Sequence, residues 1–138
     1  MNNRLLFITD DDAEDRDLLR DALLQERYDG AIEVASDGEE FMQKLAGLKQ
    51  AHTLPHLLVL DLNMPLKDGY QVLQELKADN MLSEIPVIVF TSSLDEREAT
   101  RCIEYGCLKL LRKPYNLAGF RAVACDIIQL VNTLGKYA

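Results

Sequence analysis

Polar side chains able to hold a metal or a phosphoryl group follow four short apolar segments of this sequence. The segments 5–9, 57–60, 87–91 and 108–111 lead into Asp10-Asp11-Asp12, Asp61-Leu62-Asn63-Met64-Pro65, Thr91-Ser92-Ser93 and Lys113-Pro114, respectively. Carboxylates crowded within a few Å repel one another by several kcal/mol without a cation, and an all-oxygen donor set suits Mg²⁺. Three carboxylates, one Mg²⁺ and the Lys113 ammonium sum to zero charge. The sequence therefore predicts a near-neutral site that can accept a phosphoryl group, with Asp61 as the candidate acceptor.

The elements that must position these residues alternate along the chain. Predicted strands cover residues 5–9, 32–35, 57–60, 87–91 and 108–111, with helical periodicity between them. The segments 57–60 and 87–91 are nearly unbroken apolar runs, as strands covered on both faces require. This alternation predicts an α/β fold with a parallel sheet between helices, and such sheets bind ligands outside the carboxyl ends of their strands.

Helix starts are marked by residues that favour the N-cap position. Asp12 favours a cap of the first helix, Ser93 to Glu96 fits a capping box for the fourth, and Asn116 favours a cap of the fifth, which extends to about residue 134. Glu14, Asp15 and Asp17 are interpreted as structural, since they suit the positive end of a helix dipole and a solvated face.

The apolar stripe of the fifth helix has two interpretations. It is expected to be ordinary core. In the alternative interpretation, Val123, Leu130 and Tyr137 form a dimer face.

Composition and charge narrow the class of protein. The chain has 138 residues, with 23 acidic against 15 basic residues and a net charge of -8. We expect a single domain over 1–138 with a core of about 4–134. The acidic balance disfavours direct binding to nucleic acid or anionic lipid.

No apolar run is expected to be long enough to cross a membrane, and the N-terminus does not resemble a secretory signal, so a cytoplasmic location is expected. Cys102, Cys107 and Cys125 are expected to be buried, reduced thiols.

Together these motifs resemble the receiver domain of two-component response regulators. The resemblance spans about residues 4–134. It rests on four motifs in order, each at a strand end: Asp10-Asp11, the Asp61 to Pro65 segment with Gly69 behind it, Thr91-Ser92-Ser93 and Lys113-Pro114. It implies a doubly wound, flavodoxin-like sheet of five parallel strands in the order 2-1-3-4-5, with helices on both faces. The chain also resembles the small stand-alone regulators that partner bacterial phytochromes and other histidine kinases, so no output domain is expected.

The resemblance also implies site roles. Asp61 would accept a phosphoryl group from a phosphohistidine of a sensor histidine kinase. Mg²⁺ would be held by Asp11, Asp61 and the carbonyl of Asn63, while Asp10 orders a metal-bound water. Thr91 and Lys113 would contact the phosphoryl group, and the Lys113-Pro114 peptide would be cis.

The same resemblance implies a signalling protein rather than an enzyme, with an unidentified downstream protein as its target. It also implies a possible homodimer through the fourth helix, fifth strand and fifth helix. The chain departs from the family at Leu110, where an aromatic residue usually reports phosphorylation, so aromatic gating is doubtful. Phosphoacceptance itself is expected to be unaffected.

Two other classes fit parts of the sequence. A phosphohydrolase of the haloacid dehalogenase type uses Asp-x-Asp after its first strand, which Asp10 and Asp12 satisfy, but Glu14 stands where such enzymes need Thr or Val. A flavin-binding electron carrier would share the sheet topology. It would need a phosphate-binding loop after the first strand, rich in Ser, Thr or Gly, and a tryptophan for stacking, and the sequence has neither.

Overall fold

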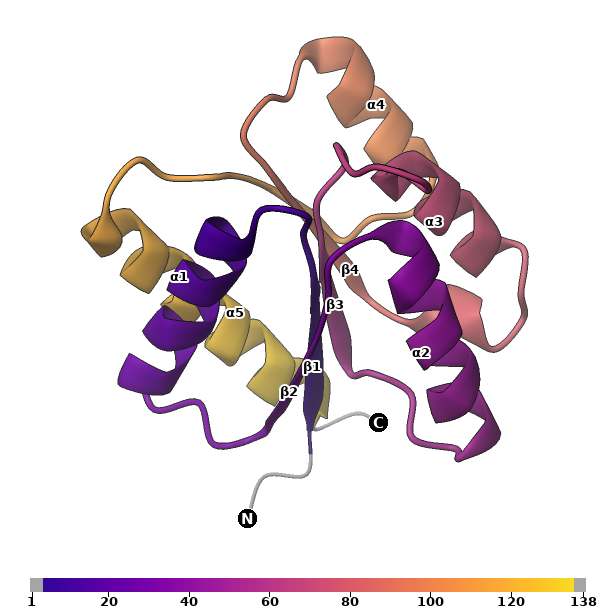
Figure 1. Cartoon of the computed structure of the whole chain (residues 1–138), viewed down its shortest axis with the longest axis horizontal. Helices are drawn as coiled ribbons and strands as arrows, with labels where there is room; N and C mark the ends of the chain where they lie inside the picture. Colours follow the sequence, from indigo (N-terminus) through magenta and orange to yellow (C-terminus); the bar gives the residue numbers. More distant parts are fainter. Residues whose placement is uncertain (1–3, 136–138) are drawn as a thin grey trace.

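The computed structural model describes residues 4–135 and has one parallel sheet covered by helices on both faces (Figure 1). Its five strands lie in the order β2-β1-β3-β4-β5. The predicted α/β, doubly wound, flavodoxin-like fold is confirmed. The predicted single domain over 1–138 stays a prediction.

The strands are short and pair in register. Their bounds are β1 Leu5–Thr9, β2 Ala31–Ala35, β3 Leu57–Leu60, β4 Val87–Thr91 and β5 Lys109–Arg112. Every residue of β3 and β4 is buried, which explains why both segments are apolar throughout. The fifth strand was predicted over 108–111, one residue too early. Because β5 is a half-exposed edge strand, its apolar residues do not mark where the strand ends.

Residues 4–135 form five α-helices, of which the first four connect successive strands and the fifth follows β5, and acidic side chains cap the first four. Their bounds are α1 Ala13–Gln25, α2 Gly38–Gln50, α3 Gly69–Lys77, α4 Glu96–Glu104 and α5 Leu117–Gly135, with a 3₁₀ turn, η1, at Leu82–Glu84. The caps Asp12, Asp37, Asp68 and Asp95 each accept a hydrogen bond from the amide three residues on. The expected capping box from Ser93 is therefore wrong, since Asp95 caps α4. Asn116 Oδ1 accepts from the Gly119 amide at 2.8 Å, as expected for the start of α5.

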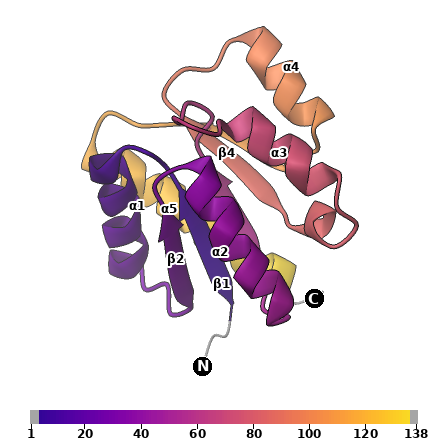
Figure 2. The ribbon, with the colours of Figure 1, turned by 45° about the vertical axis from the view of Figure 1, so that its right-hand side comes forward.

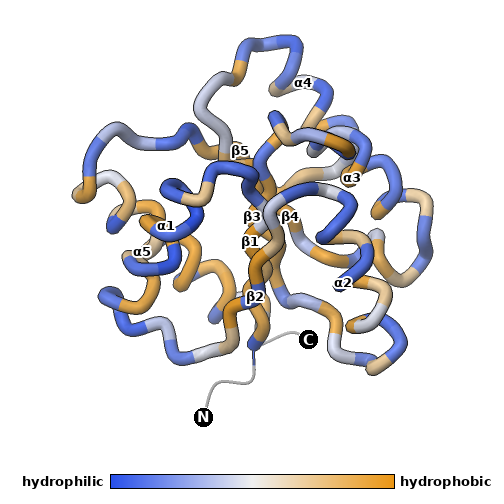
Figure 3. The backbone as a smooth tube through the Cα atoms, viewed as in Figure 1, coloured by the Kyte–Doolittle hydropathy of each residue, from blue (hydrophilic) through white to orange (hydrophobic). Residues whose placement is uncertain are grey.

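Two apolar clusters lie on opposite faces of the sheet. Alternate residues of each central strand point to opposite faces, so Phe7 packs with α2 and α3 while Ile8 packs with α1 and α5. Phe7 meets Phe41 of α2 edge to face, with ring centroids 4.8 Å apart. Figures 2 and 3 show the two helical layers and the apolar strands between them. Because helices cover both faces of the sheet, polar functional side chains are expected in the loops at its carboxyl edge.

The helix α5 is long and apolar enough, by length and composition, to cross a membrane over Leu117–Leu134. This differs from the expectation that no segment reaches that length. Its buried residues Phe120, Ala124, Ile127 and Val131 belong to the core beside α1, and Val123 and Leu130 pack half-buried around them. These contacts favour the core interpretation of the stripe. Tyr137, the third residue of the alternative dimer face, lies outside the described residues.

The three cysteines differ in burial. All three are free thiols, and Cys102 is buried as expected, but Cys107 is half-buried and Cys125 is exposed. The expectation of burial was wrong for these two: Cys107 lies in the loop between α4 and β5, where it only partly packs against the core, and Cys125 lies on an exposed part of α5.

Candidate functional site

Backbone hydrogen bonds extend the strand ladders just past the strands and fix the site residues at the carboxyl edge of the sheet. The Asp61 amide donates to Thr9 O at 3.0 Å, and the Lys113 amide donates to Thr91 O at 2.9 Å. The Asp10 amide likewise donates to Ala35 O at 3.1 Å. The residues after β1, β3 and β5 are therefore held at the same edge of the sheet although they are far apart in sequence.

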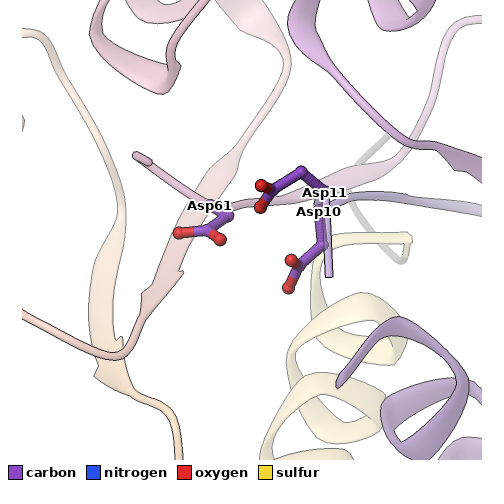
Figure 4. Close-up of side chains that lie close together, drawn as sticks. All are labelled: Asp10, Asp11 and Asp61. Atoms are coloured by element: carbon purple, nitrogen blue, oxygen red, sulfur yellow. The ribbon is translucent and has the colours of Figure 1, made fainter. Parts of the chain in front are cut away.

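Three carboxylates converge at this edge. Asp10, Asp11 and Asp61 each offer an oxygen within 4.8 Å of the others (Figure 4). Asp10 and Asp61 are buried, whereas Asp11 is exposed. All their offered atoms are oxygens, which is the donor chemistry that a hard divalent cation requires. The residues present thus fit a divalent metal, with Asp11 on the side open to solvent.

The Lys113 ammonium lies among buried carboxylates. Its Nζ is 2.9 Å from Asp10 Oδ2, 3.2 Å from Asp61 Oδ2 and 3.0 Å from Asp15 Oδ2. An ammonium has three N–H donors, so these three acceptors can use all of them. Lys113 is 8% exposed, and its aliphatic stem and charge are both taken out of water.

Electrostatics at the site reflect this crowding. Burial raises the pKa of Asp10 to about 7, an effect that the hydrogen bonds from Lys113 and the Asp12 amide only partly oppose, while the charge of Asp61 adds to it. Burial alone would lower the pKa of Lys113, but its contacts with Asp10, Asp15 and Asp61 outweigh this and raise it above its ordinary value. The folded site therefore favours additional positive charge, from a proton or from a metal.

Thr91 and Asn63 lie at the ends of β4 and β3. The Thr91 hydroxyl is buried and has no hydrogen-bond partner among the described residues. A buried hydroxyl without a partner is energetically costly, so a hydrogen bond from Thr91 Oγ1 to an incoming oxygen would be favourable. Asn63 is exposed, and its amide donates to Asp61 Oδ1 at 3.3 Å, in a bend of the chain just after Asp61.

Gly69 allows the loop after β3 to close against the site. Its amide donates to Leu62 O at 2.9 Å. A Cβ at this position would lie 2.5 Å from Asp61 O and 2.7 Å from Leu62 Cα, which are backbone atoms that cannot yield easily. Glycine is needed here for close approach of the two backbones.

Two residues of α1 contact the site, and the sequence analysis assigned neither of them to it. Asp15 was interpreted as a helix-dipole residue, yet its carboxylate contacts Lys113. Arg16 Nη1 donates to Asp10 O at 2.7 Å. Both residues lie in the first turn of the helix that follows Asp10-Asp11-Asp12. This closeness in sequence could have indicated that they contact the site. The expected cis Lys113-Pro114 peptide is wrong, since residues 4–135 contain no cis peptide bond.

The comparisons with known proteins agree with this geometry. The family described as response regulator receiver domain matches residues 6–124. The response regulator Rcp1 of Synechocystis is 32% identical over 83% of this chain and 79% of its own length. A probable chemotaxis protein CheY of Rhizobium etli is 32% identical over 85% of this chain and 86% of its own. The chain belongs to the response regulator receiver domain family.

Solved structures extend the similarity to stand-alone regulators. The phosphorylated cyanobacterial phytochrome response regulator RcpA has a TM-score of 0.83 and 30% identity, covering 91% of each chain. The Mn²⁺-bound form of Rcp1 has a TM-score of 0.77 and 29% identity over 90% of this chain and 91% of its own. Other relatives are longer: this chain spans about half of a probable transcriptional regulator, ycf27, of Porphyridium aerugineum, at 35% identity.

Proposed function

We propose that this chain is a phosphorylation switch in which Asp61 accepts a phosphoryl group from a phosphohistidine of a sensor histidine kinase. An Asp61 carboxylate oxygen forms a bond to phosphorus while the bond between phosphorus and the imidazole nitrogen breaks. The observation that carries the proposal is the convergence of Asp10, Asp11 and Asp61 within 4.8 Å beside the Lys113 ammonium.

The charges of Asp10, Asp11, Asp61 and Lys113 explain why this site is suited to phosphoryl transfer. Asp11, Asp61 and the Asn63 carbonyl would hold Mg²⁺, and Asp10 would orient one of its waters. When bound, the ion neutralises negative charge on the phosphoryl oxygens. Mn²⁺ in the related Rcp1 supports a divalent ion here, and the all-oxygen donor set favours Mg²⁺.

Two further side chains would receive the phosphoryl oxygens. Lys113 lies 3.2 Å from Asp61 Oδ2 and supplies an N–H donor with a full positive charge. The unpartnered Thr91 hydroxyl supplies a second donor, and taking up a phosphoryl oxygen would draw the β4–α4 loop toward the site. With Leu110 half-buried in β5 rather than an aromatic residue, this loop movement is the proposed route to the surface.

The wider role follows from the same reaction. We propose a cytoplasmic signalling protein that receives its phosphoryl group from a sensor kinase and passes the signal to an unidentified protein, without itself binding nucleic acid or membrane. A homodimer through α4, β5 and α5 is also proposed, supported by Ile103 and Leu108, which are 64% and 52% exposed on that face.

Acetyl phosphate with Mg²⁺ tests the acceptor assignment. Intact-mass measurement of the wild type should show one added phosphoryl group, and the Asp61→Asn variant should show none. The Asp126→Asn variant removes the same charge from an exposed position on α5 and should behave as wild type. Omission of Mg²⁺ should abolish the modification.

The same experiment separates the hydrolase alternative. That class would carry the phosphoryl group on Asp10, with Asp12 as the acid, but Asp12 is exposed and caps α1 through the Asp15 amide at 3.1 Å. Covalent phosphate that survives Asp61→Asn and disappears in Asp10→Asn would refute the phosphoacceptor role of Asp61.

A further inference from the structure

Lys113 is contacted by a carboxylate that the proposed transfer does not use. Asp15 lies in the first turn of α1, and its Oδ2 is 3.0 Å from Lys113 Nζ. Its side chain is 27% exposed, so the contact is only partly screened by solvent. With Asp10 at 2.9 Å and Asp61 at 3.2 Å, each of the three N–H donors of the ammonium has a carboxylate acceptor.

We propose that Asp15 is a positioning residue that restrains Lys113 and slows phosphoryl acceptance by Asp61 from an anionic donor. This inference rests on the proposed function and deepens it. Asp15 touches neither the acceptor nor the phosphoryl group in the reaction. By contact it acts only on the ammonium, which it ties to α1, and it acts on the incoming anion only through its charge.

Charge and hydrogen bonding give this restraint its direction. Transfer places negative phosphoryl oxygens next to Asp61, and they need an N–H from Lys113 that Asp15 competes for. Asp15 Oδ2 and Asp61 Oδ2 share one nitrogen at 3.0 and 3.2 Å, so they are at most about 6 Å apart. Asp15 therefore also repels the arriving anion directly.

The size of the effect follows from that separation. Repulsion between unit charges about 6 Å apart corresponds to roughly 3-fold in rate in a water-like medium and to roughly 100-fold in a protein-like one. Because Asp15 is partly exposed, the lower part of this range applies, and removing its charge should speed acceptance about 3- to 10-fold.

The test compares Asp15→Asn with the wild-type full chain, using acetyl phosphate and Mg²⁺ and measuring initial rates of phosphoprotein formation by intact mass. Asparagine keeps the shape and an oxygen acceptor but loses the charge. Glu14→Gln is the matched control, because Glu14 is an exposed acidic residue in the same first turn of α1. Asp15→Glu restores the charge, and urea unfolding checks that each variant is folded. If Asp15→Asn does not fold, Asp15→Ser takes its place.

The expected result is an increase of about 3- to 10-fold for Asp15→Asn, less than about 2-fold for Glu14→Gln, and a rate near wild type for Asp15→Glu. The gain should appear as a lower half-saturating donor concentration and should shrink at high salt. An unchanged or slower Asp15→Asn, or an equal gain in Glu14→Gln, overturns the inference while leaving the proposed function standing. Absence of phosphoryl incorporation in the wild type overturns the proposed function and this inference with it.

Discussion

Replacing Asp61 by asparagine should make the metal-free protein more stable and, at the same time, remove its stabilisation by Mg²⁺. Asp61 is 5% exposed and lies within 4.8 Å of carboxylate oxygens of Asp10 and Asp11. Its favourable partner is Lys113, at 3.2 Å. The variant keeps the side-chain shape and removes one negative charge from a crowded group.

The magnitude can be worked from these distances at pH 8, where Asp10, with a pKa of about 7, is mostly ionised. At a protein-like dielectric, repulsion from Asp10 is about 3.5 kcal/mol and attraction to Lys113 about 5 kcal/mol, while exposed Asp11 adds about 1 kcal/mol of screened repulsion. These contributions nearly cancel. What remains is the cost of burying a carboxylate, several kcal/mol, part of which the neutral amide avoids. Lys113 keeps Asp10 and Asp15 as partners, so no buried charge is left alone. We expect a gain of about 2 kcal/mol.

Urea unfolding followed by circular dichroism measures this difference, with EDTA or with excess Mg²⁺. At 100 times its dissociation constant, Mg²⁺ should stabilise the wild type by about 2.7 kcal/mol and the variant by much less, so the order of stability reverses. The exposed Asp126→Asn variant controls for general charge removal. A metal-free Asp61→Asn protein less stable than wild type, or equal stabilisation of both by Mg²⁺, would refute the reasoning.

Three further outcomes follow from the same contacts. The pKa of Asp10 is raised in the folded state, so its proton competes with the metal: calorimetric Mg²⁺ affinity should fall about 10-fold from pH 8 to pH 6, and metal-free stability should fall as pH rises from about 4 to 7. A pH-independent affinity would contradict this. Gly69→Ala places a Cβ against the backbone of Asp61 and Leu62 and should cost about 1–3 kcal/mol in urea unfolding. Thr91→Val removes a buried unpartnered hydroxyl, so stability should be unchanged or up to about 1 kcal/mol higher while phosphorylation by acetyl phosphate slows; a large loss of stability would show that the hydroxyl is bonded.

Much of the architecture could be predicted from the sequence because the central strands are buried on both faces. An unbroken apolar run of four or five residues, as in 57–60 and 87–91, is typical of a strand that is buried on both faces of a parallel sheet. The edge strand β5 carries a weaker pattern, so its bounds were displaced. The cap of α4 was also missed, because Ser93 and Asp95 both favour that position and only the backbone conformation selects Asp95.

The site residues at the strand ends could be predicted for a related reason. Parallel strands bring their carboxyl ends to one edge, so Asp10, Asp61, Thr91 and Lys113 had to lie near one another once the topology was fixed. Their roles in phosphoryl transfer stay predictions until the experiments above are done. Neither the distances between them nor the burial that raises the pKa of Asp10 is contained in the order of residues.

Only the tertiary structure decided how the charge of Lys113 is shared. Asp15 and Lys113 are 98 positions apart, and their contact depends on the angle at which α1 leaves the sheet and on the path of the chain after β5. Sequence patterns determine which face of an element is apolar, because burial repeats with the period of the helix or strand. A single ion pair between two such elements has no period. It is set by packing alone, and here that packing joins α1 to the acidic site at the carboxyl edge of the sheet.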